Sequence, residues 1–202
     1  MTIHTLLQGK KIMVTGAARG LGLGFAQTIA KAGATVVMAD ILTELVEQEA
    51  KQLQQQGLGV HAVGLDLSQP ESIRSAVQFA ADTLNGLDGL VNCAALATGV
   101  GGKDLMQYDP DLWDRVMTIN VKGTWLMVQA CVPYLKQSGA AKIINVASDT
   151  ALWGAPKLMA YVASKGAIIS MTRSMARELG EFNICVNTIS PGLTLVEATE
   201  YV

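Results

Sequence analysis

The sequence is poor in charged residues. Only 16% of its 202 residues are Asp, Glu, Lys or Arg, against ~25% in an average globular protein. Fifteen basic and seventeen acidic residues leave a formal net charge of −2. Such a chain lacks the basic field that holds a nucleic acid, so we expect no nucleic-acid partner. Because half of its residues are hydrophobic, it also lacks the composition of a disordered protein.

The sequence also lacks an apolar run of membrane-spanning length, although its mean hydropathy is +0.32. The longest charge-free stretches, 89–102 and 183–196, contain Gly and Asn and fall short of the ~18 apolar residues that a spanning helix needs. Residues 1–11 have neither the apolar region nor the cleavage site of a signal peptide. We therefore expect a cytoplasmic protein without a membrane segment.

Cysteine and histidine are scarce, with three and two residues. Cys93, Cys131 and Cys185 have no CxxC spacing, and neither histidine is in register with other metal-ligand types. We therefore expect a reducing compartment and no metal site.

One pattern repeats along the chain: a short β-branched run, a turn with Gly, Asp or Asn, and an amphipathic helix. Continuously apolar strands that alternate with helices predict a parallel sheet covered on both faces, which is the doubly wound α/β architecture with three αβα layers. At ~150 residues per domain, the length indicates a single domain over residues 1–202.

The turn signals predict where the elements lie. We expect strands at 11–15, 35–39, 60–65, 87–92, 142–147 and 184–189. We expect helices that end near residues 32 and 84, and helices at 43–56, 110–136 and 156–180. Ser68 and Glu71 predict a capping box at the start of the helix that ends near Leu84.

Glycines are concentrated in the turn after the first strand, Thr15-Gly16-Ala17-Ala18-Arg19-Gly20-Leu21-Gly22. Glycine permits a tight turn, and the free amides and dipole of a helix N-terminus favour an anion such as a pyrophosphate. The GxxxGxG spacing lacks the GK[ST] of a P-loop, which disfavours a nucleoside triphosphatase. Taken alone, the motif is equally consistent with a tight turn that binds nothing.

Two acidic residues end the second and third strands. Asp40 can accept hydrogen bonds from both adenosine ribose hydroxyls and repels a 2′-phosphate, which favours NAD over NADP. Arg19 favours NADP instead, because a basic residue in this turn can meet that phosphate; we give Asp40 more weight. Asp66 can reach the adenine edge, or it can be an ordinary turn residue.

Tyr161 and Lys165 lie one turn apart on one helix face. A tyrosine with a pKa of ~10 is a poor base at neutral pH, but a nearby cation favours the phenolate and lowers that pKa. Ser148 follows the fifth strand, at the sheet edge where ligands bind. Its hydroxyl can hold a substrate oxygen beside the phenol.

In order and spacing, these motifs resemble the short-chain dehydrogenase/reductase family over essentially the whole chain. The resemblance is carried jointly by residues 15–22, Asp40, Asp66, Asn92, Asn120, Ser148, Tyr161, Lys165, Pro191 and Gly192. It implies a single-domain Rossmann fold and an NAD(P)-dependent oxidoreductase. Hydride then moves at the nicotinamide, and the proton moves through the tyrosine.

The resemblance also implies roles for individual residues. Tyr161 is the general acid/base, Lys165 lowers its pKa and binds the nicotinamide ribose, and Ser148 polarises the carbonyl or alcohol. Asn120 perturbs its helix and holds a water that links Lys165 to solvent. We expect substrate contacts from Ser148, Thr150, Trp153 and Tyr161, and cofactor contacts from Gly16, Arg19, Gly20, Leu21, Gly22, Asp40, Asp66, Leu67, Asn92, Ala94, Tyr161, Lys165, Pro191, Gly192 and Thr194.

The sequence departs from the family pattern in three places. The family's NNAG reads Asn92-Cys93-Ala94-Ala95 here, so Ala95 replaces a glycine and we expect a small local adjustment. We interpret Cys93 as a small buried hydrophobe rather than a nucleophile. Val196 stands where the family has a threonine, and Thr194 is the candidate to replace it at the carboxamide.

Family members usually continue beyond the point where this sequence stops. We therefore expect the chain as given to lack the family's last strand and helix. The helices at about 110–136 and 156–180 carry apolar residues on more than one face, which suggests association. The resemblance implies a homotetramer, with a dimer as the alternative.

The predicted substrate is a small hydrophobic, aromatic or cyclic alcohol or ketone, because the segments expected to line the pocket are apolar. The sequence leaves a second hypothesis open: a catalytically silent NAD-binding regulatory or scaffold protein on the same fold. A dehydratase or epimerase usually has an extended-type turn and a larger C-terminal domain, neither of which is seen here.

Overall fold

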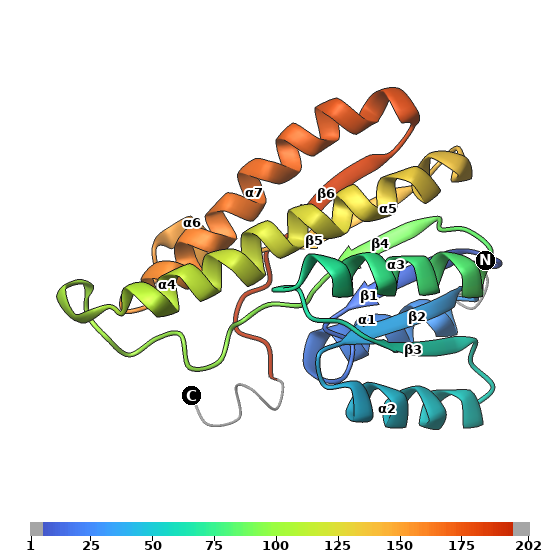
Figure 1. Cartoon of the computed structure of the whole chain (residues 1–202), viewed down its shortest axis with the longest axis horizontal. Helices are drawn as coiled ribbons and strands as arrows, with labels where there is room; N and C mark the ends of the chain where they lie inside the picture. The colour runs from blue at the N-terminus through green and yellow to red at the C-terminus, as the bar shows by residue number, and fades with distance from the viewer. Residues whose placement is uncertain (1–5, 196–202) are drawn as a thin grey trace.

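The computed structural model describes residues 6–195 as a parallel six-stranded sheet with helices on both faces (Figure 1). The strands are β1 (Lys11–Thr15), β2 (Thr35–Asp40), β3 (Val60–Gly64), β4 (Gly89–Asn92), β5 (Lys142–Val146) and β6 (Cys185–Ile189). They lie in the order β3-β2-β1-β4-β5-β6. The predicted doubly wound fold is confirmed, and the strand ranges agree closely with the predicted ones.

Both faces of the central strands are apolar, because successive side chains of a strand point to opposite faces and helices cover both faces there. One face of β6 is exposed at Cys185, Asn187 and Ile189. Met13 and Val37 belong to the core under α3 (Pro70–Leu84), α5 (Thr124–Ser138) and α7 (Met159–Leu179). Val14 and Met38 belong to the core under α1 (Gly20–Lys31) and α2 (Thr43–Gln55). This double covering accounts for the continuously apolar strands.

The strand order reverses at β1, with β2 and β3 on one side and β4, β5 and β6 on the other. Ligands of open α/β sheets bind outside the carboxyl ends of the strands at this point. The last residues of β1 and β4, Thr15 and Asn92, pair directly. The turn after β1 and the loop after β4 therefore leave the sheet side by side.

The helix predicted from about 110 to 136 is interrupted in the structure. It consists of α4 (Pro110–Val116), a π-helical segment η3 (Met117–Gly123), and α5. Asn120 lies in the middle of η3, at the position where a perturbation of the helix was expected from the sequence. π-Helical turns of this kind occur mostly at functional sites.

The helix predicted from about 156 to 180 begins later than expected. A short α6 (Thr150–Trp153) ends at Gly154, which has a φ of +74°, and α7 begins only at Met159. Helix α7 is otherwise continuous over the predicted range, and the short α6 before it was not predicted.

The predicted capping box at Ser68 is wrong. Helix α3 begins at Pro70 with Gln69 as its N-cap. The Ser68 hydroxyl instead donates a hydrogen bond to the Asp66 carboxylate (2.7 Å). The carboxylate two residues earlier is a charged acceptor, which makes the stronger hydrogen bond.

The described residues also bear on cysteine pairing, membrane spans and metal ligands. All three cysteines are free: Cys131 is buried, Cys93 is half-buried and Cys185 is exposed. Within residues 6–195 no helix combines the length and hydropathy of a membrane span. The same residues contain no cluster of three or more His, Cys, Asp or Glu side chains that could hold a metal ion.

Candidate active site

The turn after β1 requires its glycines. Gly16 and Gly20 have φ values of +69° and +58°, a region that disfavours residues with a Cβ. A Cβ on Gly22 would lie 1.9 Å from the carbonyl oxygen of Gly16. Helix α1 therefore packs directly against the turn, and its N-terminus lies at the carboxyl end of β1.

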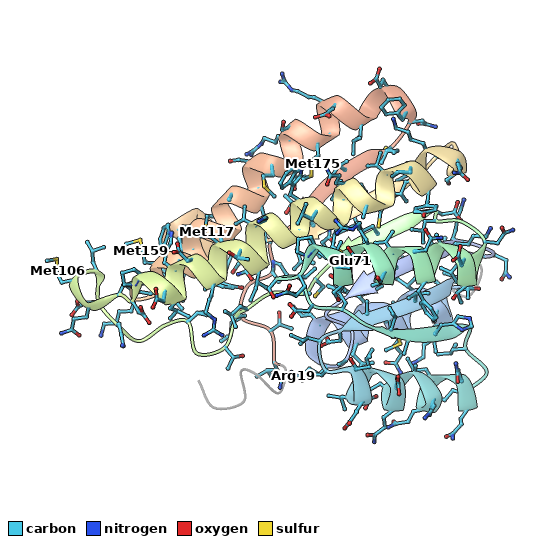
Figure 2. The ribbon with its side chains drawn as sticks, in the orientation of Figure 1. Arg19, Glu71, Met106, Met117, Met159 and Met175 are labelled. Atoms are coloured by element: carbon cyan, nitrogen blue, oxygen red, sulfur yellow. The ribbon has the colours of Figure 1, made fainter. Side chains whose placement is uncertain are left out.

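The N-terminus of α1 suits an anion. Its N-cap Arg19 is extended and makes no side-chain capping bond, and the first turn, which includes Leu21, contains no acidic residue. Free N–H groups and the helix dipole at such an end favour a phosphate. Figure 2 shows Arg19 at the end of the molecule where the segment after β6 also lies.

Asp40 is buried at the end of β2 and faces this turn. Its Oδ2 accepts a hydrogen bond from the Ala18 amide (3.0 Å), and its Oδ1 accepts one from the Leu42 amide (3.0 Å). A carboxylate has about four lone-pair positions, so acceptor capacity remains. Asp40 thus holds the glycine turn and can still accept a hydrogen bond from a ribose hydroxyl.

Asp66 and Leu67 follow β3 and serve the local structure. Asp66 Oδ1 accepts hydrogen bonds from the amide (2.8 Å) and the hydroxyl of Ser68. Leu67 is buried against η3, where a Cβ on Gly123 would lie 2.8 Å from the Leu67 Cβ. The hydrogen bonds to Ser68 support the interpretation of Asp66 as a turn residue, which the sequence left open.

Thr15 joins the glycine turn to the loop after β4. Its Oγ1 accepts hydrogen bonds from the amides of Cys93 and Ala94, both at 3.1 Å. A Cβ on Gly16 would lie 2.7 Å from the Ala94 Cα, so Ala94 lies directly against the turn. No separate role was predicted for Thr15 from the sequence. Its position at the start of the glycine turn could have indicated one.

A buried polar chain runs beneath the site between β4, β5 and α7. Asn92 Nδ2 donates to Asn145 Oδ1 (2.9 Å), and Asn145 Nδ2 donates to Thr172 Oγ1 (2.9 Å). Asn92 Oδ1 is buried and has no hydrogen-bond partner among residues 6–195. An unpaired buried acceptor is costly, so Asn92 is ready to receive a donor at the carboxyl end of β4.

Cys93 is not an activated thiol. It packs against the core beneath α1 and α2, and burial raises its pKa to about 11. A thiol that is protonated at neutral pH is a weak nucleophile. The interpretation of Cys93 as a small hydrophobe therefore agrees with the structure.

Asn120 connects η3 to the loop after β4 and to α7. Its Oδ1 accepts a hydrogen bond from the Leu96 amide (2.7 Å), and its Nδ2 donates to the Leu96 carbonyl (3.2 Å) and to Ser164 Oγ (3.1 Å). The Ser164 hydroxyl in turn donates to the Tyr161 carbonyl (2.7 Å). Asn120 therefore fixes the first turn of the helix that carries the tyrosine, a connection through Ser164 that the sequence did not reveal.

Lys165 is 4% exposed, and its Nζ donates a hydrogen bond to the Val146 carbonyl (2.7 Å) at the end of β5. The same Nζ lies 5.7 Å from the centroid of the Tyr161 ring. Burial lowers the pKa of Lys165 to about 8. The ammonium is thus held beside the phenol by the strand end.

Tyr161 is half-buried beside Ser148. Burial raises the pKa of the phenol, a hydrogen bond with Ser148 lowers it, and the charge of Asp149 raises it. The expectation that Lys165 lowers this pKa is not met in the present geometry. Desolvation of the phenol by burial is the largest effect and outweighs the hydrogen bond with Ser148.

Ser148 is buried at the end of β5 and is held by the first residue of α6. Its Oγ accepts hydrogen bonds from the Thr150 hydroxyl (2.8 Å) and the Thr150 amide (3.3 Å). With these acceptor positions used, the Ser148 proton can be donated to the phenol or to a substrate oxygen. The role of Thr150 is thus to orient Ser148.

The mouth of the site is apolar. Trp153 is 62% exposed, so the structure does not bear out the alternative that it packs between helices. Leu152 and Leu193 are also exposed. The Pro191 carbonyl accepts a hydrogen bond from the Asp149 amide (3.1 Å), and Thr194 Oγ1 donates to the Gly192 carbonyl (3.3 Å). Val196 lies outside the described residues.

The fold and the site define a class of protein. A glycine turn and helix N-terminus at the switch point of a parallel sheet bind dinucleotides, and Ser148, Tyr161 and Lys165 lie at the same sheet edge. The molecule is therefore a Rossmann-type enzyme with a hydroxyl, phenol and ammonium at its dinucleotide site.

Comparison with known proteins agrees with this class. Residues 10–202 match the family model described as short chain dehydrogenase. The chain is 34% identical over 193 residues to a cyclopentanol dehydrogenase of Comamonas sp., covering 96% of this chain and 76% of that protein. It is 36% identical over 196 residues to a 3-alpha-(or 20-beta)-hydroxysteroid dehydrogenase of Mycobacterium bovis, covering 97% of this chain and 73% of that protein.

A crystal structure of 3-ketoacyl-(acyl-carrier-protein) reductase from Brucella melitensis complexed with NADH superposes with a TM-score of 0.89 at 32% identity, covering 95% of this chain and 78% of that one. The chain belongs to the short-chain dehydrogenase/reductase family. It is an NAD(P)-dependent oxidoreductase of the kind that acts on CH–OH donors.

Proposed function

We propose that this enzyme transfers a hydride between NAD and the carbinol or carbonyl carbon of a small hydrophobic, aromatic or cyclic alcohol or ketone. The observation that carries the proposal is the grouping of Ser148, Tyr161 and Lys165 at one sheet edge beside the glycine turn. The exposed apolar mouth at Leu152, Trp153 and Leu193 supports the substrate class. The relatives named for cyclopentanol and hydroxysteroids point the same way.

The residues present fit a nicotinamide dinucleotide. The glycine turn and the α1 N-terminus would hold the pyrophosphate, and Asp40 would hold the adenosine ribose. Asn92, whose buried Oδ1 has no partner in the described chain, and Lys165 would hold the nicotinamide ribose. When bound, the cofactor supplies the hydride acceptor or donor.

The side chains of this enzyme supply orientation and proton transfer. Ser148 donates a hydrogen bond to the substrate oxygen, and Tyr161 takes the alcohol proton or returns it to the carbonyl oxygen. Lys165 places a positive charge 5.7 Å from the centroid of the Tyr161 ring, which would favour the phenolate against the opposing effect of burial. Asn120 acts as a positioning residue, because its bonds to Leu96 and Ser164 fix the start of α7.

NAD is the proposed cofactor because Asp40 is buried directly beside the turn. The 2′-phosphate of NADP would place additional negative charge on the ribose, close to the Asp40 carboxylate. Arg19 is exposed and makes no side-chain capping bond at the start of α1. Its charge is screened by solvent and offsets the repulsion only weakly.

The test follows NADH or NADPH absorbance during oxidation of cyclopentanol, secondary aromatic alcohols and hydroxysteroids. We expect turnover with NAD and at least tenfold weaker kcat/KM with NADP. Turnover with NADP alone would overturn the cofactor assignment. NADH binding without turnover of any alcohol or ketone would favour the regulatory protein instead.

We also propose a homotetramer, with a dimer as the alternative, in the cytoplasm. A surface groove of about 560 Å³ lies over η3, α5 and α7, and its lining includes Met117, Val121, Trp125 and Met171. Apolar side chains in an exposed groove favour association. Sedimentation equilibrium tests this proposal. We expect a tetramer for the wild type and a smaller species for Trp125→Glu. A wild-type monomer at micromolar concentration would overturn the proposal.

A further inference from the structure

The carboxylate of Asp149 lies in the wall of the site and has no bonding partner in the described part of the chain. Asp149 follows Ser148 directly and precedes α6. Its backbone is fully used: the amide donates to the Pro191 carbonyl (3.1 Å), and the carbonyl accepts from the amides of Leu152 (2.7 Å) and Trp153 (3.3 Å). Its side chain makes no capping bond to α6, and no ion pair involves it within residues 6–195.

Aspartate at a helix start usually caps the helix with its side chain. Here Thr150 turns its own hydroxyl and amide towards Ser148 instead. The backbone hydrogen bonds of Asp149 already hold this segment in place, so its carboxylate is not needed for that purpose. The half-buried Asp149 carboxylate is therefore available to a ligand that enters the site.

One contact and one electrostatic effect place the Asp149 carboxylate. Its Oδ2 lies 3.2 Å from the position that a Cβ on Gly192 would occupy, so it rests against the Pro191–Gly192 turn. Its negative charge raises the pKa of the Tyr161 phenol. Lys165, the cation beside that phenol, is buried and donates its hydrogen bond to the Val146 carbonyl. The carboxylate thus lies against the Gly192 turn and close enough to the phenol for its charge to act there.

We propose that Asp149 determines substrate specificity: it selects alcohols that carry a hydrogen-bond donor, a hydroxyl or an ammonium, on the carbon next to the reacting carbinol, and it rejects those that carry an anionic group there. The inference rests on the proposed function, because the phenol must face the carbinol. A donor on the adjacent carbon then reaches the carboxylate, whereas an anion meets its charge without a compensating cation.

The experiment compares four alcohols of one skeleton: cyclohexanol, vicinal cyclohexanediol, vicinal aminocyclohexanol, and vicinal hydroxycyclohexane carboxylate. We expect kcat/KM for the diol and the amino alcohol to exceed that for cyclohexanol by about tenfold or more, the effect of one charge-assisted hydrogen bond. We expect the carboxylate to be the poorest substrate.

Two variants separate charge from hydrogen bonding. Asp149→Asn keeps an acceptor oxygen but removes the charge, so the preference for the amino alcohol and the rejection of the carboxylate should both fall towards the cyclohexanol value, while part of the diol preference remains. Asp149→Ala should abolish all three differences. Asp111→Asn, at an exposed carboxylate in the first turn of α4, is the matched control and should leave the ratios unchanged.

A binding readout accompanies the kinetics. Quenching of nicotinamide fluorescence measures how tightly each ligand joins the enzyme–NADH complex, and the diol should bind more tightly to the wild type than to Asp149→Ala. If the wild type oxidises none of the four alcohols, the proposed function fails together with this inference. If it oxidises them with equal efficiency, or if the Asp149 variants leave the ratios unchanged, the inference alone is overturned.

Discussion

The two halves of the sheet edge work by different means. On the side of β1 and β2, the site is made of backbone: positive φ values at Gly16 and Gly20, close packing at Gly22, and amides held by Asp40 and Thr15. On the side of β5 and α7, it is made of side chains that come from distant segments. The comparison shows that a dinucleotide phosphate can be bound by the shape of the backbone alone. Acid/base chemistry instead needs several side chains aligned in one place.

The largest expected effect removes the phenol of the side-chain half. Tyr161→Phe should lower kcat by about 10²- to 10⁴-fold, the range for loss of a general acid or base. NADH binding measured by fluorescence should survive, because the backbone half is untouched. Loss of binding together with turnover would show that the two halves are not independent. Tyr134→Phe, on the outer part of α5 and bonded only to Gln78, is the control.

The next effect tests the backbone half. Gly22→Ala places a Cβ 1.9 Å from the Gly16 oxygen, so we expect a loss of stability of ~1–3 kcal/mol or more from overpacking, together with weaker NADH binding. Gly24→Ala in the same helix meets nothing within 4 Å and should stabilise the protein by ~0.5–1 kcal/mol. Thermal unfolding and NADH titration measure both. Equal behaviour of the two variants would contradict the close packing of α1 on the turn.

A third prediction concerns the link between the halves. Asn120→Ala leaves the half-buried Leu96 amide without its acceptor and removes the bond to Ser164, which should cost ~1–3 kcal/mol of stability. Because Asn120 acts through Ser164 on the start of α7, kcat should fall more than KM rises. The control is Asn187→Ala on the exposed side of β6. If the variant loses stability but keeps its kcat, Asn120 has a structural role only.

The smallest effect is a shift in pH dependence. The charge of Asp149 raises the pKa of Tyr161, and alcohol oxidation needs the deprotonated phenol, so the rate should rise with pH through that pKa. Asp149→Asn removes the negative neighbour and lowers the pKa, so the rising limb should move to lower pH. The kcat–pH profile of Asp111→Asn should match that of the wild type. A limb that moves to higher pH would contradict the sign of the interaction.

The sequence predicted one half of the site better than the other. Asp40 and the glycine turn are close in the chain to the helix and strand that they serve, so local spacing sufficed to place them. The partners of the other half were not foreseen: Ser164 on Asn120, Thr150 on Ser148, and Val146 on Lys165. Each depends on rotamer choice and on where a chain segment ends, which periodicity does not encode.

The wrong capping box at Ser68 has the same origin. It was predicted from a local pattern, but the neighbouring Asp66 carboxylate competes for the Ser68 hydroxyl. A capping side chain is worth ~1 kcal/mol, whereas a hydrogen bond to a charged group is worth ~1.5–3 kcal/mol. The local pattern therefore loses to the charged acceptor.

The order of apolar strands, turns and helices by itself determined the doubly wound sheet, and the spacing of the motifs determined the family and the candidate catalytic residues. Both follow from periodicity and from glycine stereochemistry, which act between near neighbours in the chain. The tertiary structure alone decided the raised pKa of Tyr161, the engagement of Lys165 by Val146, and the unbonded carboxylate of Asp149 against Gly192. Desolvation and charge act through space, so they exist only once distant segments have been brought together.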